Sequence, residues 1–116
     1  MADVTIYHNP KCSASRNTLA LIREAGIEPK IVEYLKTPPS ARELKAIIKR
    51  MGVGVRDVIR TKEEAYATLK LDNPKLSDDQ LIEAMVAHPI LIQRPIVVTA
   101  KGVRLGRPPE SVKEIL

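Results

Sequence analysis

The stretch Thr5-Ile6-Tyr7-His8-Asn9-Pro10-Lys11-Cys12-Ser13-Ala14-Ser15-Arg16-Asn17 decides the fold. In it, a short apolar run ends at a Pro-containing turn, and the only cysteine of the chain follows at once. Apolar residues at helical spacing begin directly behind that cysteine. This order predicts a buried strand over 4–7, a helix from Ser13 or Ser15 to about Ala25, and Cys12 at the helix start.

Cys12 is predicted to be a nucleophile. At a helix start the first backbone N–H groups lack helical partners and the peptide dipoles sum to about half a positive charge, which favours a thiolate. Lys11 and Arg16 add positive charge, and such surroundings lower a thiol pKa of about 8.5 by roughly one to several units. The alternative is a buried cysteine that acts as a small hydrophobe. The polar neighbours of Cys12 argue against that alternative.

The composition is that of one soluble globular domain, predicted to span residues 1–116. Of the 116 residues, 44% are hydrophobic and 28% are charged, and the absence of Trp and Phe predicts an aliphatic core. A single cysteine cannot form an internal disulfide, so any disulfide chemistry must be intermolecular. No apolar run reaches the length of a membrane span and no signal pattern opens the chain. We therefore expect a cytoplasmic protein without a membrane partner.

The net charge of +5 and the pI of about 9.5 raise the question of nucleic-acid binding. The basic residues are scattered rather than clustered, and aromatic residues for base stacking are nearly absent. We therefore expect no nucleic-acid partner. A positive surface also suits a small oxyanion or an acidic partner protein.

The remaining chain predicts further elements in a recognisable order. A strand over 31–34 completes a parallel, right-handed βαβ unit. Capping patterns at Ser40 and Ser77 begin two amphipathic helices, with shorter helical segments over 55–59 and 62–69 between them. A strand over 96–99, a tight turn over 100–102, a strand over 103–105 and a helix over 110–116 follow. The order βαβ, helices, ββα predicts an α/β, thioredoxin-like fold with a mixed four-stranded sheet and an all-helical insertion over approximately 40–88.

Three stretches together resemble the glutaredoxin-coupled arsenate reductases: residues 6–18, residues 88–98 and Arg104-Leu105-Gly106-Arg107-Pro108. The resemblance covers essentially the whole chain. It implies that arsenate is reduced to arsenite, with glutathione as co-substrate, glutaredoxin as protein partner, and no bound cofactor or metal.

The resemblance also implies a role for six residues. Cys12 matches the nucleophile, and Ser15 matches a hydroxyl that can hydrogen-bond the thiolate. His8 matches a histidine associated with lowering the cysteine pKa. The arginines that hold the oxyanion are matched by Arg60, Arg94 and Arg107.

The chemistry of the residues supports these roles. Attack by a thiolate on an arsenate dianion needs compensating positive charge, because two like charges about 4 Å apart repel by on the order of 4 kcal/mol near a protein surface. Arginine binds tetrahedral oxyanions through its planar fork and keeps its charge at physiological pH. Arg94 precedes Pro95 in an X-Pro bond that the fold predicts to be cis. Since the chain has no second cysteine, the second thiol has to come from glutathione or a partner.

Other interpretations of the supporting residues stay open at this point. Arg60 could simply pair with Asp57, Glu63 or Glu64 on a helical surface. His8 could be a turn residue that donates to a backbone carbonyl.

Two other functions also fit the sequence. One is a redox-sensing regulator similar to the Spx-type proteins that bind RNA polymerase, although those typically use Cys-x-x-Cys and position 15 here is Ser. The other is a glutathione-dependent thiol protein with a different substrate.

Overall fold

The computed structural model describes residues 3–116. The chain divides into two compact units. The sheet unit comprises the described residues up to Thr37 together with Arg94–Leu116, and the helical unit comprises Pro38–Gln93. The helical unit contains the predicted insertion and extends beyond it at both ends. That residues 1–116 form a single domain stays a prediction.

The sheet unit is built on four strands: β1 (Thr5–Tyr7), β2 (Lys30–Val32), β3 (Ile96–Thr99) and β4 (Gly102–Leu105). Their order in the sheet is β2-β1-β3-β4. β1 pairs in parallel with β2, and the β1–β3 and β3–β4 pairs are antiparallel. The predicted mixed four-stranded sheet, with its βαβ unit and its C-terminal hairpin, is confirmed.

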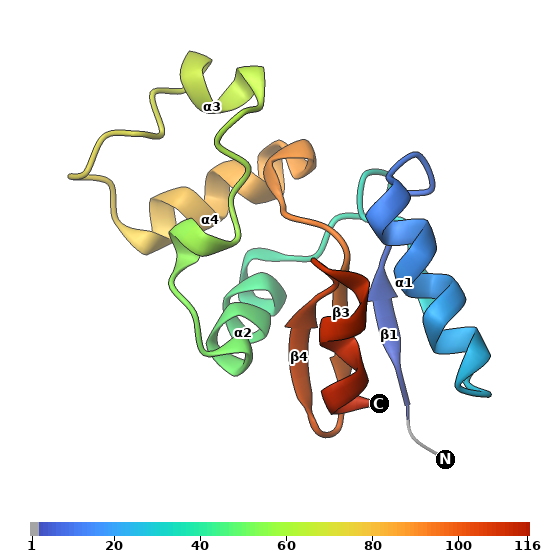
Figure 1. The fold of residues 1–116 in the computed structure, drawn as a ribbon. Coiled ribbons are helices and arrows are strands. Elements are labelled where there is room, and N and C mark those ends of the chain that lie inside the picture. Colours follow the sequence, from blue (N-terminus) through green and yellow to red (C-terminus); the bar gives the residue numbers. More distant parts are fainter. Residues whose placement is uncertain (1–2) are drawn as a thin grey trace. The chain divides into compact units, whose positions relative to one another are not determined.

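The core of the sheet unit lies between the strands and two helical segments, α1 (Ser13–Glu24) and η3 (Pro109–Ile115). Figure 1 shows α1 in blue and the C-terminal turns in red on the same side of the strands. The buried cluster is entirely aliphatic, as predicted, and consists of Val4, Ile6, Ile22, Val97, Val112 and Ile115. Burying these branched side chains on both layers fixes α1 against the sheet.

The helical unit contains α2 (Ala41–Met51), η1 (Val55–Asp57), α3 (Glu64–Thr68), α4 (Asp78–Ala87) and η2 (Pro89–Leu91). Both predicted capping boxes form. Ser40 and Ser77 accept hydrogen bonds from the backbone N–H groups of Glu43 and Gln80 at the starts of α2 and α4. The two helices contact each other, and their buried faces are Leu44, Ile47, Ile48, Leu81, Ile82 and Met85.

Several predicted boundaries were wrong. β2 ends at Val32 rather than Tyr34, because the backbone N–H groups of Lys36 and Thr37 both donate to Glu33 and turn the chain. The helix predicted over 62–69 is limited to α3, after which Lys70 takes a left-handed conformation (φ 54°). The helix predicted over 110–116 is present as a 3₁₀ helix over Pro109–Ile115.

Candidate active site

Cys12 is the residue immediately before α1, as predicted. The turn that carries Cys12 is closed by two hydrogen bonds to Asn9: its backbone C=O accepts from Cys12 N–H and its Oδ1 accepts from Lys11 N–H, each at 3.0 Å. The Asn side chain thus mimics a backbone turn, which is why an Asn-Pro pair ends β1 here. The C=O of Cys12 then accepts the first helical hydrogen bond, from Arg16. The side chain of Cys12 therefore lies among the unpaired N–H groups of the helix start.

The pKa of Cys12 lies below the ordinary value of a thiol. Burial raises the pKa of Cys12, but the backbone N–H of Ser15, the Arg94 guanidinium and the backbone N–H of Ala14 together lower it by more. Hydrogen bonding to the sulfur, first from Ser15 N–H and then from Arg94, contributes more to the lowering of this pKa than the charge of Arg94 alone. The thiol itself is half-buried and reachable from solvent. These properties are those of a reactive cysteine rather than of a core residue.

Arg94 is held directly before β3, and its peptide bond to Pro95 is cis, as predicted. Two polar atoms of its side chain, Nε and Nη1, are buried and have no hydrogen-bond partner among residues 3–116. Buried N–H groups without an acceptor are rare and costly in proteins, most of all on a charged group. The Arg94 guanidinium therefore offers two N–H groups to an acceptor anion beside the Cys12 thiol.

Arg107 is brought to Arg94 by the hairpin of β3 and β4. Its exposed guanidinium donates from Nη1 to the backbone C=O of Arg94 at 3.3 Å. The chain reaches this position through Gly106, where an added Cβ would overlap Thr18 Oγ1 and lie 2.7 Å from Pro95 Cγ. Only a glycine lets β4 leave the sheet so close to α1. The structure thus brings together Cys12, Arg94 and Arg107 in the sheet unit.

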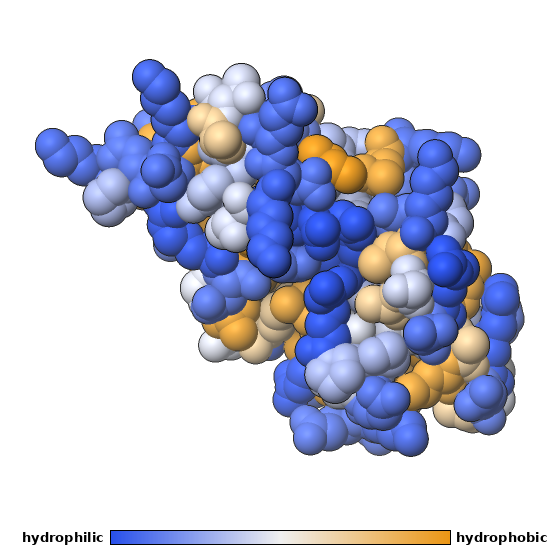
Figure 2. Space-filling model, turned by 45° about the horizontal axis from the view of Figure 1, so that its top comes forward, coloured by the Kyte–Doolittle hydropathy of each residue, from blue (hydrophilic) through white to orange (hydrophobic). Residues whose placement is uncertain are grey.

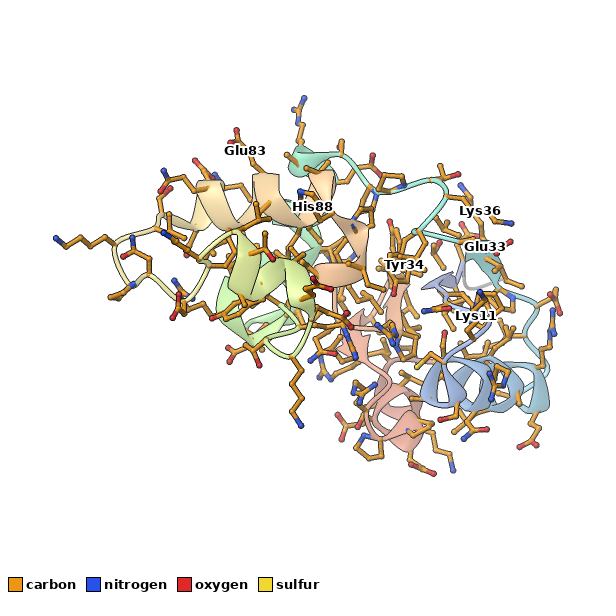
Figure 3. The ribbon with its side chains drawn as sticks, turned by 90° about the horizontal axis from the view of Figure 1, so that it is seen from above. Lys11, Glu33, Tyr34, Lys36, Glu83 and His88 are labelled. Atoms are coloured by element: carbon orange, nitrogen blue, oxygen red, sulfur yellow. The ribbon has the colours of Figure 1, made fainter. Side chains whose placement is uncertain are left out.

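His8 and Ser15 form a buried pair next to the cysteine. His8 Nδ1 and Ser15 Oγ lie 2.6 Å apart, and the hydroxyl also accepts from Asn9 N–H at 3.0 Å. Burial lowers the pKa of His8, Glu33 raises it, and the net shift is downward, so His8 is neutral near pH 7. Glu33, which directly follows β2 in the sequence, is labelled in Figure 3. His8 therefore pairs with a hydroxyl rather than a backbone carbonyl, and the residue that carries this hydroxyl, Ser15, also lowers the pKa of Cys12 through its backbone N–H.

Arg60 belongs to the helical unit, where it lies between η1 and α3. Its Nε donates to Glu63 Oε1 at 3.1 Å and its Nη1 donates to Gln93 Oε1 at 3.3 Å. Of the three carboxylates considered as its partner, Glu63 is the one that pairs with it, whereas Asp57 accepts from the backbone N–H of Gly54.

Sequence reasoning missed three residues that shape the site. Asn9 and Thr18 are buried polar residues, with exposed fractions of 5% and 0%, and both hold main-chain turns through their side chains. Asn9 could have been found from the Asn-Pro turn signal. Thr18 and Gln93 carry no local signal, because their partners are distant in sequence.

The surroundings of the site are polar and basic. Lys11, labelled in Figure 3, and Arg16 are exposed at the start of α1. Hydrophilic residues dominate the face of the molecule in Figure 2, with small hydrophobic patches between them. None of the helices in residues 3–116 has the length and hydropathy that a membrane span requires. No group of three or more His, Cys, Asp or Glu side chains that could hold a metal ion occurs in the same residues.

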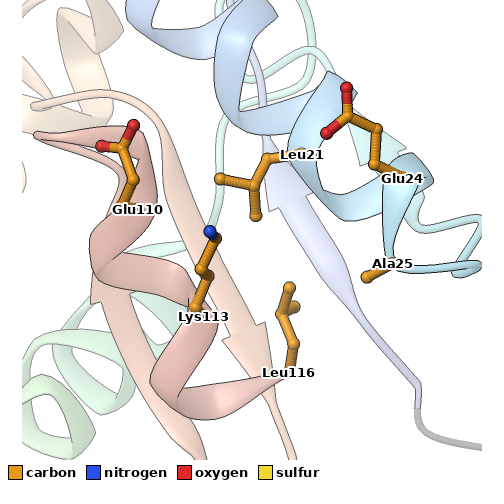
Figure 4. Close-up of a pocket in the computed structure, with 6 residues that line it drawn as sticks. All are labelled: Leu21, Glu24, Ala25, Glu110, Lys113 and Leu116. Atoms are coloured by element: carbon orange, nitrogen blue, oxygen red, sulfur yellow. The ribbon is translucent and has the colours of Figure 1, made fainter.

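A pocket of about 500 Å³ lies between α1 and η3 in the sheet unit (Figure 4). It contains no predicted site residue, because it lies at the far end of α1 from Cys12. Its lining consists of Leu21, Glu24, Ala25, Glu110, Lys113 and Leu116.

The sheet and the reactive cysteine define an α/β protein of the thioredoxin-like class, with a low-pKa thiol at the first helix and arginines beside it. The chain belongs to the ArsC family, whose family model matches residues 7–115. It is 58% identical to an arsenate reductase of Rhizobium meliloti (strain 1021), over 97% of this chain and 81% of that protein. It is 49% identical to the uncharacterized protein YfgD of Escherichia coli (strain K12), over 97% of this chain and 96% of that protein. The solved structure of an arsenate reductase from Vibrio cholerae matches with a TM-score of 0.96 and 54% identity, over 98% of both chains.

Proposed function

We propose that this protein is an arsenate reductase in which the Cys12 thiolate attacks arsenic. Relatives at 54–58% identity over nearly the full chain are arsenate reductases. The observation that carries the proposed site is the pairing of two features: a thiol whose pKa is lowered, and an arginine beside it with two buried, unpartnered N–H groups.

The first step is a substitution at arsenic. The sulfur of Cys12 forms a bond to arsenic, and one arsenate oxygen leaves as hydroxide or water. A thiolate is needed because a neutral thiol is a weak nucleophile, and the N–H groups of Ser15 and Ala14 lower the pKa of Cys12 and so favour the ionised sulfur. The product of this step is a covalent thiol–arsenate adduct on Cys12.

The arginines make the encounter of two anions productive. Arg94 donates its free N–H groups to arsenate oxygens while its charge also stabilises the thiolate. Arg107 approaches the oxyanion from the exposed side, where its contact with the Arg94 backbone aims it. Arg60 is the third oxyanion-binding residue of the proposal, on the strength of the family resemblance.

His8 and Ser15 complete the proposed set as thiolate-stabilising residues. The Ser15 hydroxyl accepts from Asn9, so its single proton goes either to His8 Nδ1 or to the thiolate. Which of the two receives it depends on the tautomer of His8. His8 thus acts on Cys12 through the hydroxyl of Ser15.

Reduction needs two further electrons from thiols outside the chain. The glutathione thiol attacks arsenic in the adduct and displaces a second oxygen as water. The glutaredoxin thiol then attacks the glutathione sulfur; a glutaredoxin–glutathione disulfide forms, and the electron pair of the broken S–As bond stays on arsenic, which becomes As(III). Water finally hydrolyses the bond between Cys12 sulfur and As(III), which releases arsenite and regenerates the Cys12 thiol. Because every thiol in this cycle must start reduced, we propose that the protein works in the cytoplasm.

The test is arsenite formation from arsenate by the purified protein, with glutathione and glutaredoxin each omitted in turn. We expect arsenite only when both are present. Activity with glutathione alone would remove glutaredoxin from the proposal. No arsenite with any thiol source, from a protein whose Cys12 is still alkylated rapidly near pH 7, would favour a glutathione-dependent thiol protein with another substrate.

A further inference from the structure

The Arg60 side chain is held from two directions inside the helical unit. The Glu63 carboxylate accepts from Nε at 3.1 Å, and the Gln93 amide oxygen accepts from Nη1 at 3.3 Å. Glu63 is three residues ahead in the sequence, just before α3, whereas Gln93 is 33 residues away. We call the side chains of Glu63 and Gln93 the Arg60 clamp.

The backbone beneath the clamp is fixed as well. Arg60 N–H donates to Leu91 C=O at 2.7 Å, and Gln93 N–H donates to Val58 C=O at 2.8 Å. Ile59 and Ile92 form an antiparallel bridge between these two bonds. The two segments therefore make a short ladder, and the Gln93 side chain is presented to Arg60 by main-chain pairing rather than by a flexible loop.

The ion pair of the clamp is more enclosed than four other ion pairs in residues 3–116. The side chains of Arg60 and Glu63 are 21% and 26% exposed, whereas the Arg23–Glu28 pair is 49% and 68% exposed. An exposed ion pair between long, mobile side chains restricts their conformations only weakly. The Arg60 guanidinium has a half-buried partner and a second acceptor, which together hold it in one orientation. Two of the five N–H groups of Arg60 are occupied by the clamp, which leaves the others for a further acceptor.

We propose that Glu63 and Gln93 are positioning residues that hold the Arg60 guanidinium ready for the substrate oxyanion. This inference rests on the proposed function, in which Arg60 binds arsenate. Gln93 directly precedes Arg94 in the sequence, so one segment carries both an acceptor for Arg60 and the arginine that acts on Cys12. An arginine oriented before the substrate arrives loses less side-chain freedom on binding, so the clamp lowers the KM for arsenate.

The experiment measures kcat and KM for arsenate in single variants and in an Arg60→Ala background. Glu63→Ala and Gln93→Ala should each raise KM about three- to tenfold and change kcat less than twofold. Glu63→Gln keeps an acceptor oxygen and removes one negative charge, so its KM should be equal to or below that of the wild type. The matched control is Glu64→Ala, which removes the same charge from the exposed neighbouring position and should leave KM unchanged.

The Arg60→Ala background separates positioning from a general structural effect. In that background, Glu63→Ala and Gln93→Ala should change KM no further, because the residue they position is gone. An equal rise in KM with and without Arg60 would overturn the inference. A wild-type KM in Glu63→Ala, in the presence of a raised KM in Arg60→Ala, would overturn it too.

The inference and the proposed function can fail separately. If the wild-type protein produces no arsenite, the proposed function is wrong, and the clamp is tested by the protection that arsenate or phosphate gives Cys12 against alkylation. Weaker protection in Glu63→Ala, but not in Glu63→Gln or Glu64→Ala, would support the clamp. Equal protection in all variants would overturn it.

Discussion

Replacing Arg94 by glutamine should raise the pKa of Cys12. Among residues 3–116, Arg94 is the only residue whose side chain lowers this pKa, and the helix start supplies the other contributions through backbone N–H groups that the substitution leaves in place. Glutamine keeps hydrogen-bond donors but removes the charge. The expected change is therefore the loss of one charge interaction, with the thiolate still at the same helix start.

The size of the shift follows from the energy of that interaction. A hydrogen bond to a charged group contributes about 1.5–3 kcal/mol, and one pKa unit corresponds to about 1.36 kcal/mol. Cys12 is half-buried rather than enclosed, so solvent screening favours the lower end of this range. The pKa of Cys12 should rise by about one unit in Arg94→Gln, and the thiolate fraction near pH 7 should fall.

The assay is the rate of Cys12 alkylation by iodoacetamide as a function of pH. Iodoacetamide is uncharged, so the midpoint of the profile reports the thiolate alone. Arg107→Gln is the matched control, because Arg107 contacts the Arg94 backbone and is not among the groups that shift the Cys12 pKa. The reasoning is refuted if the midpoint stays where it is in Arg94→Gln, or if Arg107→Gln moves it equally far.

Three further predictions concern other parts of the sheet unit. Cys12→Ser should abolish arsenite formation and leave the circular dichroism spectrum unchanged, so retained turnover would contradict the mechanism. Folding lowers the pKa of His8, so on acidification the unfolded chain is protonated at a higher pH than the folded protein. Protonation then favours the unfolded state, and the free energy of unfolding should fall as pH drops from about 6.5 through the lowered pKa. His8→Gln should flatten this slope in denaturant titrations, and an unchanged slope in that variant would contradict the prediction. Gly106→Ala should lower the free energy of unfolding by about 1–3 kcal/mol, because the added Cβ overlaps Thr18 Oγ1. Thr18→Ala in the same chain should restore part of that loss. Strictly additive effects of the two substitutions would exclude the predicted overlap.

The fold was predictable because its signals are local. The run from Thr5 to Tyr7, the capping boxes at Ser40 and Ser77, and the strand-turn-strand pattern over 96–105 each determine an element within a few residues. Boundaries failed where a turn or a distant contact decides them. Tyr34 has the apolar, aromatic character of a strand residue and is 1% exposed, yet the turn at Glu33 has already ended β2.

Of the candidate site, only the part around Cys12 could be predicted from the residues themselves. Cys12 is marked by its own neighbours, because a strand, an Asn-Pro turn and a helix start are all visible in one stretch. The roles of Arg94 and Arg107 were assigned from the family resemblance, and the sequence did not reveal that two N–H groups of Arg94 are buried without a partner. The contact of Gln93 with Arg60 was not predicted, because the two residues are 33 positions apart in the sequence.

The register of the sheet explains why three distant residues share one site. One row of paired residues crosses the sheet at one end of its strands. It consists of Tyr7 in β1, Ile96 in β3 and Leu105 in β4. Cys12 follows the first member of this row, Arg94 precedes the second and Arg107 follows the third.

A slip of one residue between β1 and β3 would turn the core side chains Ile6 and Val97, both 0% exposed, toward the opposite face. Burial of these two side chains therefore locks the register, and the register in turn fixes where Arg94 stands relative to Cys12. Arg94 itself carries buried N–H groups that cost stability, so it cannot be the residue that holds the strands in place. The aliphatic core, not Arg94, therefore holds the strands in register. Arg94→Gln should accordingly leave the melting temperature unchanged or raise it, while Cys12 becomes less reactive.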